Sequence, residues 1–259
     1  MVDFTNNKNM KFIAEIGLNH CGSVERANEI LEDLCGTSVN IISFQIRESS
    51  FYDNTHPRKV ELPLSFYVNA IARIHRAKKL MCIAIADYEK ISQFDDIGVD
   101  QWKTLSWDLS NDRLIGALQK TNKKIYVSTG ISSMKEIQSA SKKWKEVEFI
   151  HTQLNDLIDS TNLQAIHTIR EFTGHKVAFG LHCTDHEVLY CALAFKPSAI
   201  FFYVKDETDA EHPDDLHAIP TGLVEERINM VNKLNKSLGN GEKNAMENNM
   251  HPDDDNICN

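Results

Sequence analysis

Two charged residues stand inside segments that otherwise have the composition of buried strands. Glu15 lies in the apolar run Phe12–Ile16, and Lys103 lies in the run Gln101–Leu105. An unpaired charge in such a strand would lose its hydration, so each side chain should meet an opposite charge or a ligand. A carboxylate and an ammonium group in such a place can move protons and hold anionic substrates. We therefore predict that Glu15 and Lys103 belong to a functional site.

Further polar residues stand at or just after the ends of similar runs. They are Asn19, His20, Ser43, Gln45, Arg47, Ser106, Asp108, Ser128, Thr129, Gly130, His151, Thr152, Gln153, His182, Asp185, His186, Tyr203 and Lys205. The Ser128-Thr129-Gly130 turn can offer backbone N–H groups to a phosphate, although such turns are also common without a ligand. The histidines of this set suit either metal binding or acid–base chemistry.

The runs themselves alternate with segments of helical spacing. The expected strands are Phe12–Ile16, Asn40–Gln45, Met81–Ile85, Gln101–Leu105, Lys124–Ser128, Glu146–His151, Lys176–Leu181 and Ala199–Val204. The expected helices are Ser23–Cys35, Pro63–Lys79, Glu89–Ile97, Asn111–Lys120, Ser133–Lys143, Ser160–Glu171, Asp185–Phe195 and Thr221–Leu238. Eight such units in about 240 residues predict an α/β protein of the (β/α)8 TIM-barrel class. A doubly wound open sheet is the alternative, but no GxGxxG pattern follows the first run.

In a (β/α)8 barrel the active site lies at the C-terminal ends of the strands, which is where the polar residues above are found. We expect a single barrel domain over residues 11–238, preceded by an N-terminal extension of residues 1–10. The composition becomes polar and rich in Asn after Leu238, so residues 239–259 are expected to form a flexible tail.

The composition excludes several classes of protein. The 259 residues carry 28 basic and 37 acidic side chains, a formal net charge of -9, which argues against binding to nucleic acid or an anionic membrane. No run approaches the roughly 18 apolar residues that a membrane span needs. Residues 1–11 lack the apolar stretch of a signal peptide, so the expected compartment is the cytoplasm.

The first strand also carries a specific motif. The segment Phe12–His20, followed by Gly22-Ser23, resembles the AEIG-x-NH-x-G signature of the sialic acid synthase family. Further segments resemble that family in the same order: Ser43-Phe44-Gln45, Trp102-Lys103 with Ser106, Ser128-Thr129-Gly130-Ile131, Ile150-His151-Thr152, Thr184-Asp185-His186 and His212-Pro213-Asp214. The resemblance covers about residues 11–238.

The resemblance implies a barrel enzyme that condenses phosphoenolpyruvate with the open-chain aldehyde of an amino sugar. The products would be a 2-keto acid of the nonulosonic type and phosphate, and a divalent metal, Mn or Mg, would polarise the aldehyde. The implied catalytic residues are Glu15, Lys103 and Asp214, the substrate-binding residues are Asn19, His20, Gln45, Arg47, Ser106, Ser128, Thr129, Gly130 and His151, and the metal ligands are His186 and His182. Family analogy also suggests a homodimer.

The chain departs from the family pattern at two strands. Ser43 stands where the family has a lysine, and Tyr203 stands where it has a second metal-binding histidine. The chain also resembles a barrel-only member without the C-terminal antifreeze-like domain. Two alternatives therefore stay open: a non-catalytic barrel that binds a sugar or phosphate or acts as a partner subunit, and an aldolase in which Lys103 forms a Schiff base.

Overall fold

The structure is a computed structural model that describes residues 10–54, 60–208 and 211–243. Its strands are β1 (Lys11–Gly17), β2 (Ile41–Ile46), β3 (Leu80–Ile85), β4 (Gln101–Lys103), β5 (Lys124–Ser128), β6 (Val147–His151), β7 (Val177–Gly180), β8 (Ala199–Lys205) and β9 (Ile219–Pro220). Strands β1 to β8 are parallel, each pairs with the next, and β1 also pairs with β8, so the ring is closed. The predicted (β/α)8 barrel is confirmed.

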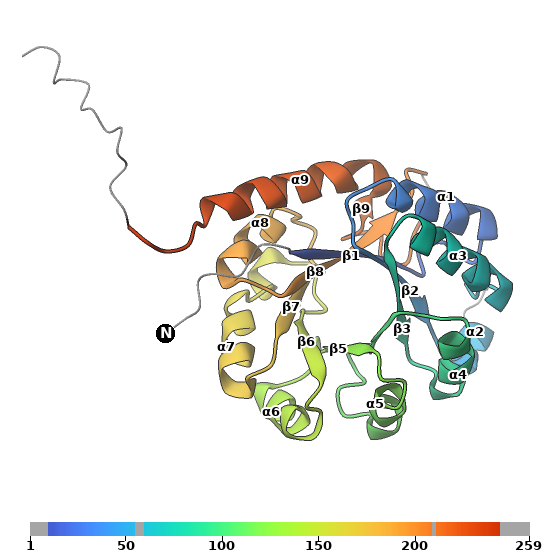
Figure 1. Cartoon of the computed structure of the whole chain (residues 1–259), viewed down its shortest axis with the longest axis horizontal. Helices are drawn as coiled ribbons and strands as arrows, with labels where there is room; N and C mark the ends of the chain where they lie inside the picture. Colours follow the sequence, from blue (N-terminus) through green and yellow to red (C-terminus); the bar gives the residue numbers. More distant parts are fainter. Residues whose placement is uncertain (1–9, 55–59, 209–210, 244–259) are drawn as a thin grey trace, which may run out of the picture.

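The helices surround this ring (Figure 1). They are α1 (Val24–Cys35), α2 (Ser49–Asn54), α3 (Leu64–Arg76), α4 (Ile91–Asp96), α5 (Asp112–Gln119), α6 (Met134–Lys143), α7 (Gln164–Thr173), α8 (Val188–Ala192) and α9 (Thr221–Ser237), with short 3-10 turns η1 (Tyr88–Lys90), η2 (Ile158–Ser160) and η3 (Leu193–Phe195). Side-chain caps fix several helix starts. Ser23 accepts a hydrogen bond from a backbone N–H of α1, and Ser133 forms a reciprocal capping box with Glu136 at α6.

Several predicted boundaries are wrong. The helix expected over 160–171 begins only at α7, because Asn162 has a positive φ of 46° that a helix cannot contain. The helix expected over 185–195 begins only at Val188 and is divided into α8 and the 3-10 turn η3. Strand β4 ends at Lys103 rather than at Leu105. Helix α2 and strand β9 were not predicted.

The barrel interior has an apolar layer and a polar layer. The apolar layer consists of Ile13, Ile41, Cys82, Tyr126, Ile150, Ala178, Ala199 and Phe201. Side chains two positions apart on a strand point the same way, so the next inward positions towards the C-terminal ends follow directly. These positions are Glu15, Ser43, Ala84, Ser128, Thr152, Gly180 and Tyr203. The period of two therefore places the functional layer immediately above the apolar one.

The predicted extension and tail fall largely outside the described residues, at 1–9 and 244–259. Residues 239–243, which are described, are exposed. Among the helices that the structure describes, none has the length and apolar character needed to cross a membrane.

Candidate active site

A cavity of about 160 Å³ opens at the C-terminal ends of the strands. It is lined by Gln45, Lys103, Leu105, Ser106, Trp107, Ser128, Ile150, Thr152, Leu154, Gly180, Leu181, His182, Phe201, Tyr203 and Asp214. Residues predicted for the site are thus brought together from β2, β4, β5 and the loops after β7 and β8. The wall mixes charged, hydroxyl and apolar groups, as expected for a pocket that orients a small ligand.

Glu15 and Lys103 form a buried ion pair beside the cavity. The Lys103 Nζ donates a hydrogen bond of 3.2 Å to Glu15 Oε2, and the side chain of Glu15 has no exposed surface. The Ser43 hydroxyl donates to the same oxygen at 2.8 Å, and the Gly17 N–H donates to Oε1 at 3.1 Å. The predicted pairing of two buried charges is present. Ser43 stands where the family pattern has a lysine, and its hydroxyl donates a hydrogen bond to the Glu15 carboxylate.

The pair keeps Lys103 protonated. Burial disfavours the ammonium group, but the neighbouring Tyr203 and Glu15 outweigh it, so the pKa of Lys103 is raised above its usual value. Tyr203 lies on β8 in register with Glu15 on β1, and the Lys103 Nζ lies 5.4 Å from the centroid of its ring. Burial raises the pKa of the Tyr203 hydroxyl, and the charge of Lys103 opposes this rise.

Asp214 enters the cavity from the loop between β8 and β9. Burial, together with the negative charge of Glu15, raises the pKa of its carboxyl group to about 7, although Lys103 opposes the shift. Gly17, with a φ of 56°, makes the approach possible. A Cβ at this position would lie 3.3 Å from Asp214 Oδ2 and 3.0 Å from Tyr203 Cε1. Glycine is therefore required at position 17 for two reasons: the backbone there is left-handed, and a side chain would collide with Tyr203 and Asp214.

Ser106 and Ser128 place two hydroxyl groups on the cavity wall, and Gly130 packs against Ser106. The Oγ atoms of Ser106 and Ser128 lie 3.0 Å apart. A Cβ at Gly130 would come within 2.5 Å of Ser106 Oγ, so only glycine fits there. Thr129 instead donates its hydroxyl hydrogen to the carbonyl of Ile150 at 2.9 Å and supports the turn from behind.

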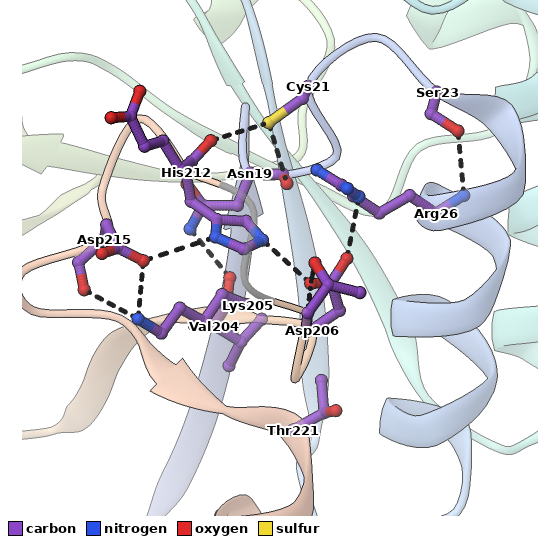
Figure 2. Close-up of polar contacts among 12 residues, drawn as sticks. Asn19, Cys21, Ser23, Arg26, Val204, Lys205, Asp206, His212, Asp215 and Thr221 are labelled. Carbon is purple, nitrogen blue, oxygen red and sulfur yellow. Dashed lines mark hydrogen bonds and ion pairs between the residues drawn. The ribbon is translucent and has the colours of Figure 1, made fainter.

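A chain of charged side chains fastens the β8–β9 loop (Figure 2). His212, whose side chain is fully buried, lies between two carboxylates: its Nε2 is 3.0 Å from Asp206 Oδ1 and its Nδ1 is 3.4 Å from Asp215 Oδ1. Asp206 is paired with Arg26 of α1 at 2.9 Å, and Asp215 with Lys205 at the end of β8 at 2.6 Å. The loop is thus tied to two elements of the barrel.

Asn19 adds a second attachment for the same loop. Its side-chain amide donates to the Val204 carbonyl at 2.8 Å, and its Oδ1 accepts a hydrogen bond of 3.0 Å from the backbone N–H of Asp214. Both ends of one buried amide are used, and they join β1, β8 and the loop. Asn19 therefore positions Asp214, whereas the sequence suggested that it binds substrate.

His182, Tyr203 and His217 form a cluster of rings. The centroids of His182 and His217 are 4.4 Å apart, and Tyr203 contacts both rings edge to face at 5.1 and 5.0 Å. Burial lowers the pKa of His182 to about 3, with the charges of His217 and Lys103 adding to the effect. Burial also lowers the pKa of His217 and of His186.

These rings do not form a metal centre of the expected kind. His182 is packed against the neighbouring rings, while His186 lies outside the cavity wall with its Nε2 3.2 Å from the His217 carbonyl oxygen. In the described ranges, no three His, Cys, Asp or Glu side chains are arranged to hold a metal ion. The residues present do not fit a Mn or Mg site, and binding of the predicted metal has not been tested.

Three other predicted residues lie outside the cavity wall. His20 is fully buried, and its Nδ1 accepts a hydrogen bond from Gly22 N in the β1–α1 turn. His151 Nε2 contacts the Thr161 carbonyl at 2.9 Å. Arg47 stands beside the rim, with its guanidinium over the rings of Phe51 and Trp107 at 3.9 and 5.0 Å.

Sequence reasoning missed His217 and the apolar wall of the cavity. His217 follows no strand, and its neighbour Asp156, 3.6 Å from Nδ1, comes from the loop after β6. Trp107 is 46% exposed and Leu154 is 43% exposed, yet both line the cavity. Their position as large apolar residues shortly after a barrel strand could have indicated from the sequence that they line the cavity.

The fold and the cavity define a (β/α)8 barrel with a polar site at the C-terminal ends of its strands. Comparison with known proteins refines this class, since residues 33–243 match the model of the NeuB family. The chain belongs to the NeuB family, which confirms the resemblance seen in the sequence.

Individual relatives agree with this assignment. The chain is 20% identical to N,N'-diacetyllegionaminic acid synthase of Campylobacter jejuni, over 92% of this chain and 80% of that protein. It is 24% identical to an uncharacterised protein of Methanocaldococcus jannaschii, over 89% and 72% of the two chains. The solved N-acetylneuraminic acid synthetase of Leptospira borgpetersenii has the same fold, with a TM-score of 0.84, 22% identity and coverage of 93% and 89%. The family and the named synthase support an enzyme of the sugar-acid synthase type.

The buried pair yields a first prediction. Lys103→Met leaves the carboxylate of Glu15 without its cation, and we expect a loss of about 3–5 kcal/mol of unfolding free energy. Combining it with Glu15→Gln should restore most of the loss, because no charge is then left buried. Urea unfolding measures both, and Lys143→Met, in an exposed pair with Asp112, should lose no more than about 1 kcal/mol. Equal losses in the single and double variants would contradict this.

A second prediction concerns the loop. His212→Gln cannot bridge Asp206 and Asp215 as the ring does, so amide exchange over residues 211–218 should become faster while exchange in the barrel strands stays unchanged. Hydrogen–deuterium exchange with mass spectrometry measures this. His75→Gln, which alters an exposed contact with Asp100, serves as the control. Unchanged exchange in the loop would show that His212 does not hold it.

The third prediction follows from the raised pKa of Asp214. The folded state holds this proton more tightly than the unfolded state, so the stabilisation is present below the ordinary pKa near 4 and is lost as the pH rises through about 7. Asp214→Asn removes this dependence. Its unfolding free energy relative to the natural chain should therefore increase between pH 5 and pH 8, and a constant difference over that range would contradict the assignment.

Proposed function

We propose that the chain condenses phosphoenolpyruvate with the open-chain aldehyde of an amino sugar, giving a 2-keto acid and inorganic phosphate. One observation carries the proposal: a protonated Lys103 and a carboxyl group that titrates near neutral pH, on Asp214, line the same small cavity. The NeuB family match and the synthase relative support the same reaction class.

The cavity offers groups for the donor substrate. Lys103 supplies the positive charge, and the hydroxyls of Ser106 and Ser128 can donate to phosphate or carboxylate oxygens. Gly130 packs directly against Ser106, so the turn after β5 holds the two hydroxyls in place. Donors fixed in this way pay little reorganisation when an anion binds.

Asp214 can carry the proton transfers. As the enol carbon C3 of phosphoenolpyruvate bonds to the aldehyde carbon, the aldehyde oxygen becomes an alkoxide and takes the proton of Asp214. Water then adds at the electron-poor C2 of the donor, and the Asp214 carboxylate accepts the first proton that this water releases. The C2–OH group then passes its proton to the phosphate oxygen as the C2–O bond breaks, which leaves the 2-keto group and inorganic phosphate. A carboxyl group with a pKa of about 7 suits both transfers.

The protonation of Lys103 argues against the aldolase alternative. A Schiff base requires a neutral amine, whereas the neighbours of Lys103 raise its pKa.

A second candidate function is supported by the charge balance. Lys103 is already paired with Glu15, and Asp214 adds a further carboxyl group to the wall, so a barrel that binds a sugar without turnover agrees with a cavity that has little net positive charge.

The deciding experiment is phosphate release from phosphoenolpyruvate with a panel of amino-sugar aldehydes. We expect release that depends on the sugar, and a loss of at least about 100-fold in Asp214→Asn, because the variant can neither give nor take the proton. Borohydride treatment with each carbonyl compound should leave Lys103 unmodified. Sugar binding by calorimetry without any phosphate release would establish the non-catalytic candidate instead.

A further inference from the structure

Tyr203 is the one phenol in the wall of the cavity, among the residues that the structure describes. Its ring is almost fully buried, at 8% exposure, and rests against Gly17, His182 and His217. These contacts fix the direction of the ring. The side chain therefore meets a ligand as a rigid group, without having to be ordered first.

The hydroxyl of Tyr203 is prepared to donate. The Lys103 ammonium group lies 5.4 Å from the centroid of the Tyr203 ring, and no residue in the described ranges accepts a hydrogen bond from the hydroxyl. A positive charge beside a phenol polarises its O–H bond and makes it a stronger donor. Its own hydrogen is thus left for a group in the cavity.

The condensation needs such a donor. When the enol carbon attacks the acceptor, negative charge develops on the carbonyl oxygen, and a fixed donor at that oxygen lowers the barrier. Asp214 lies next to Tyr203, because both approach the same face of Gly17. One residue can therefore hold the oxygen while the other delivers the proton.

The same ring also occupies the space beside the two histidines. Tyr203 packs edge to face against both His182 and His217, whose own ring centroids are 4.4 Å apart, so the three rings contact one another. His186 is engaged with the His217 carbonyl. Among the described residues, no three His, Cys, Asp or Glu side chains come together to hold a metal ion.

We propose that the Tyr203 hydroxyl, beside the Lys103 ammonium group, polarises the acceptor carbonyl, and that this chain performs its condensation without a bound divalent metal. The inference rests on the proposed function. It names Tyr203 as a catalytic residue at a position where the sequence had shown only the loss of a family histidine.

Tyr203→Phe tests the hydroxyl, because it keeps the ring and its contacts. We expect kcat for phosphate release to fall about 100-fold, with the KM for phosphoenolpyruvate nearly unchanged and the melting temperature preserved. Tyr126→Phe is the matched control, since Tyr126 is a buried tyrosine of the apolar layer whose hydroxyl has no partner. It should keep full activity. A Tyr203→Phe variant with an unchanged kcat would overturn the catalytic role.

Metal binding is measured separately from turnover. The purified chain, dialysed against a chelator, should show no saturable heat with MnCl₂ in calorimetry, and the chelator should leave phosphate release unchanged. Stoichiometric Mn²⁺ binding that disappears in His186→Ala or His182→Ala would overturn the metal-free proposal whether or not the chain turns over. Absence of phosphate release with every acceptor would refute the proposed function, and the role of Tyr203 with it.

Discussion

The ion pair between Glu15 and Lys103 is the constraint on which the site depends. Two charges inside a barrel are tolerable only if each is paired and further hydrogen-bonded. Here the Ser43 hydroxyl and the Gly17 N–H donate the further hydrogen bonds to the Glu15 carboxylate, beside the pair with Lys103. The geometry of the pair then decides much else. Gly17 must adopt a positive φ next to it, the register of β1 against β2 shifts between Glu15 and Gly17, and the space this leaves admits Tyr203 and Asp214.

The β8–β9 loop is held by charge rather than by apolar burial. Leu216 is 67% exposed, whereas His212 is enclosed by carboxylates that are themselves tied to Arg26 and Lys205. Directional contacts of this kind fix the position of a side chain more narrowly than packing of a flexible apolar residue does. Such a fastening suits a loop that must bring the carboxyl group of Asp214 to one place beside the ion pair.

The sequence predicted the parts of the molecule that obey a local period. Apolar runs alternating with helical segments predicted the eight strands, and the charges inside two of these runs indicated that Glu15 and Lys103 belong to a site. It failed where the outcome depends on residues distant in the chain. That Asn19 holds Asp214 instead of a ligand, or that His217 joins His182, follows from how separate loops meet over the barrel. The late start of α7 depended on the conformation of a single residue, Asn162.

The charge balance of the cavity links these features to its chemistry. Lys103 is paired with Glu15, and its charge also opposes the rise in the pKa of Asp214, so the proton on Asp214 is the one that can be gained or lost near neutral pH. An anionic donor substrate near Lys103 would oppose ionisation of Asp214 further and favour the protonated form, which is the form that can deliver a proton to a developing alkoxide. Binding of the donor would therefore prepare the acid before the acceptor reacts. The ring of Tyr203 lies 5.4 Å from the same ammonium group and approaches Gly17 on the same face as Asp214, so the single cation stands beside both the donor side and the acceptor side of the cavity.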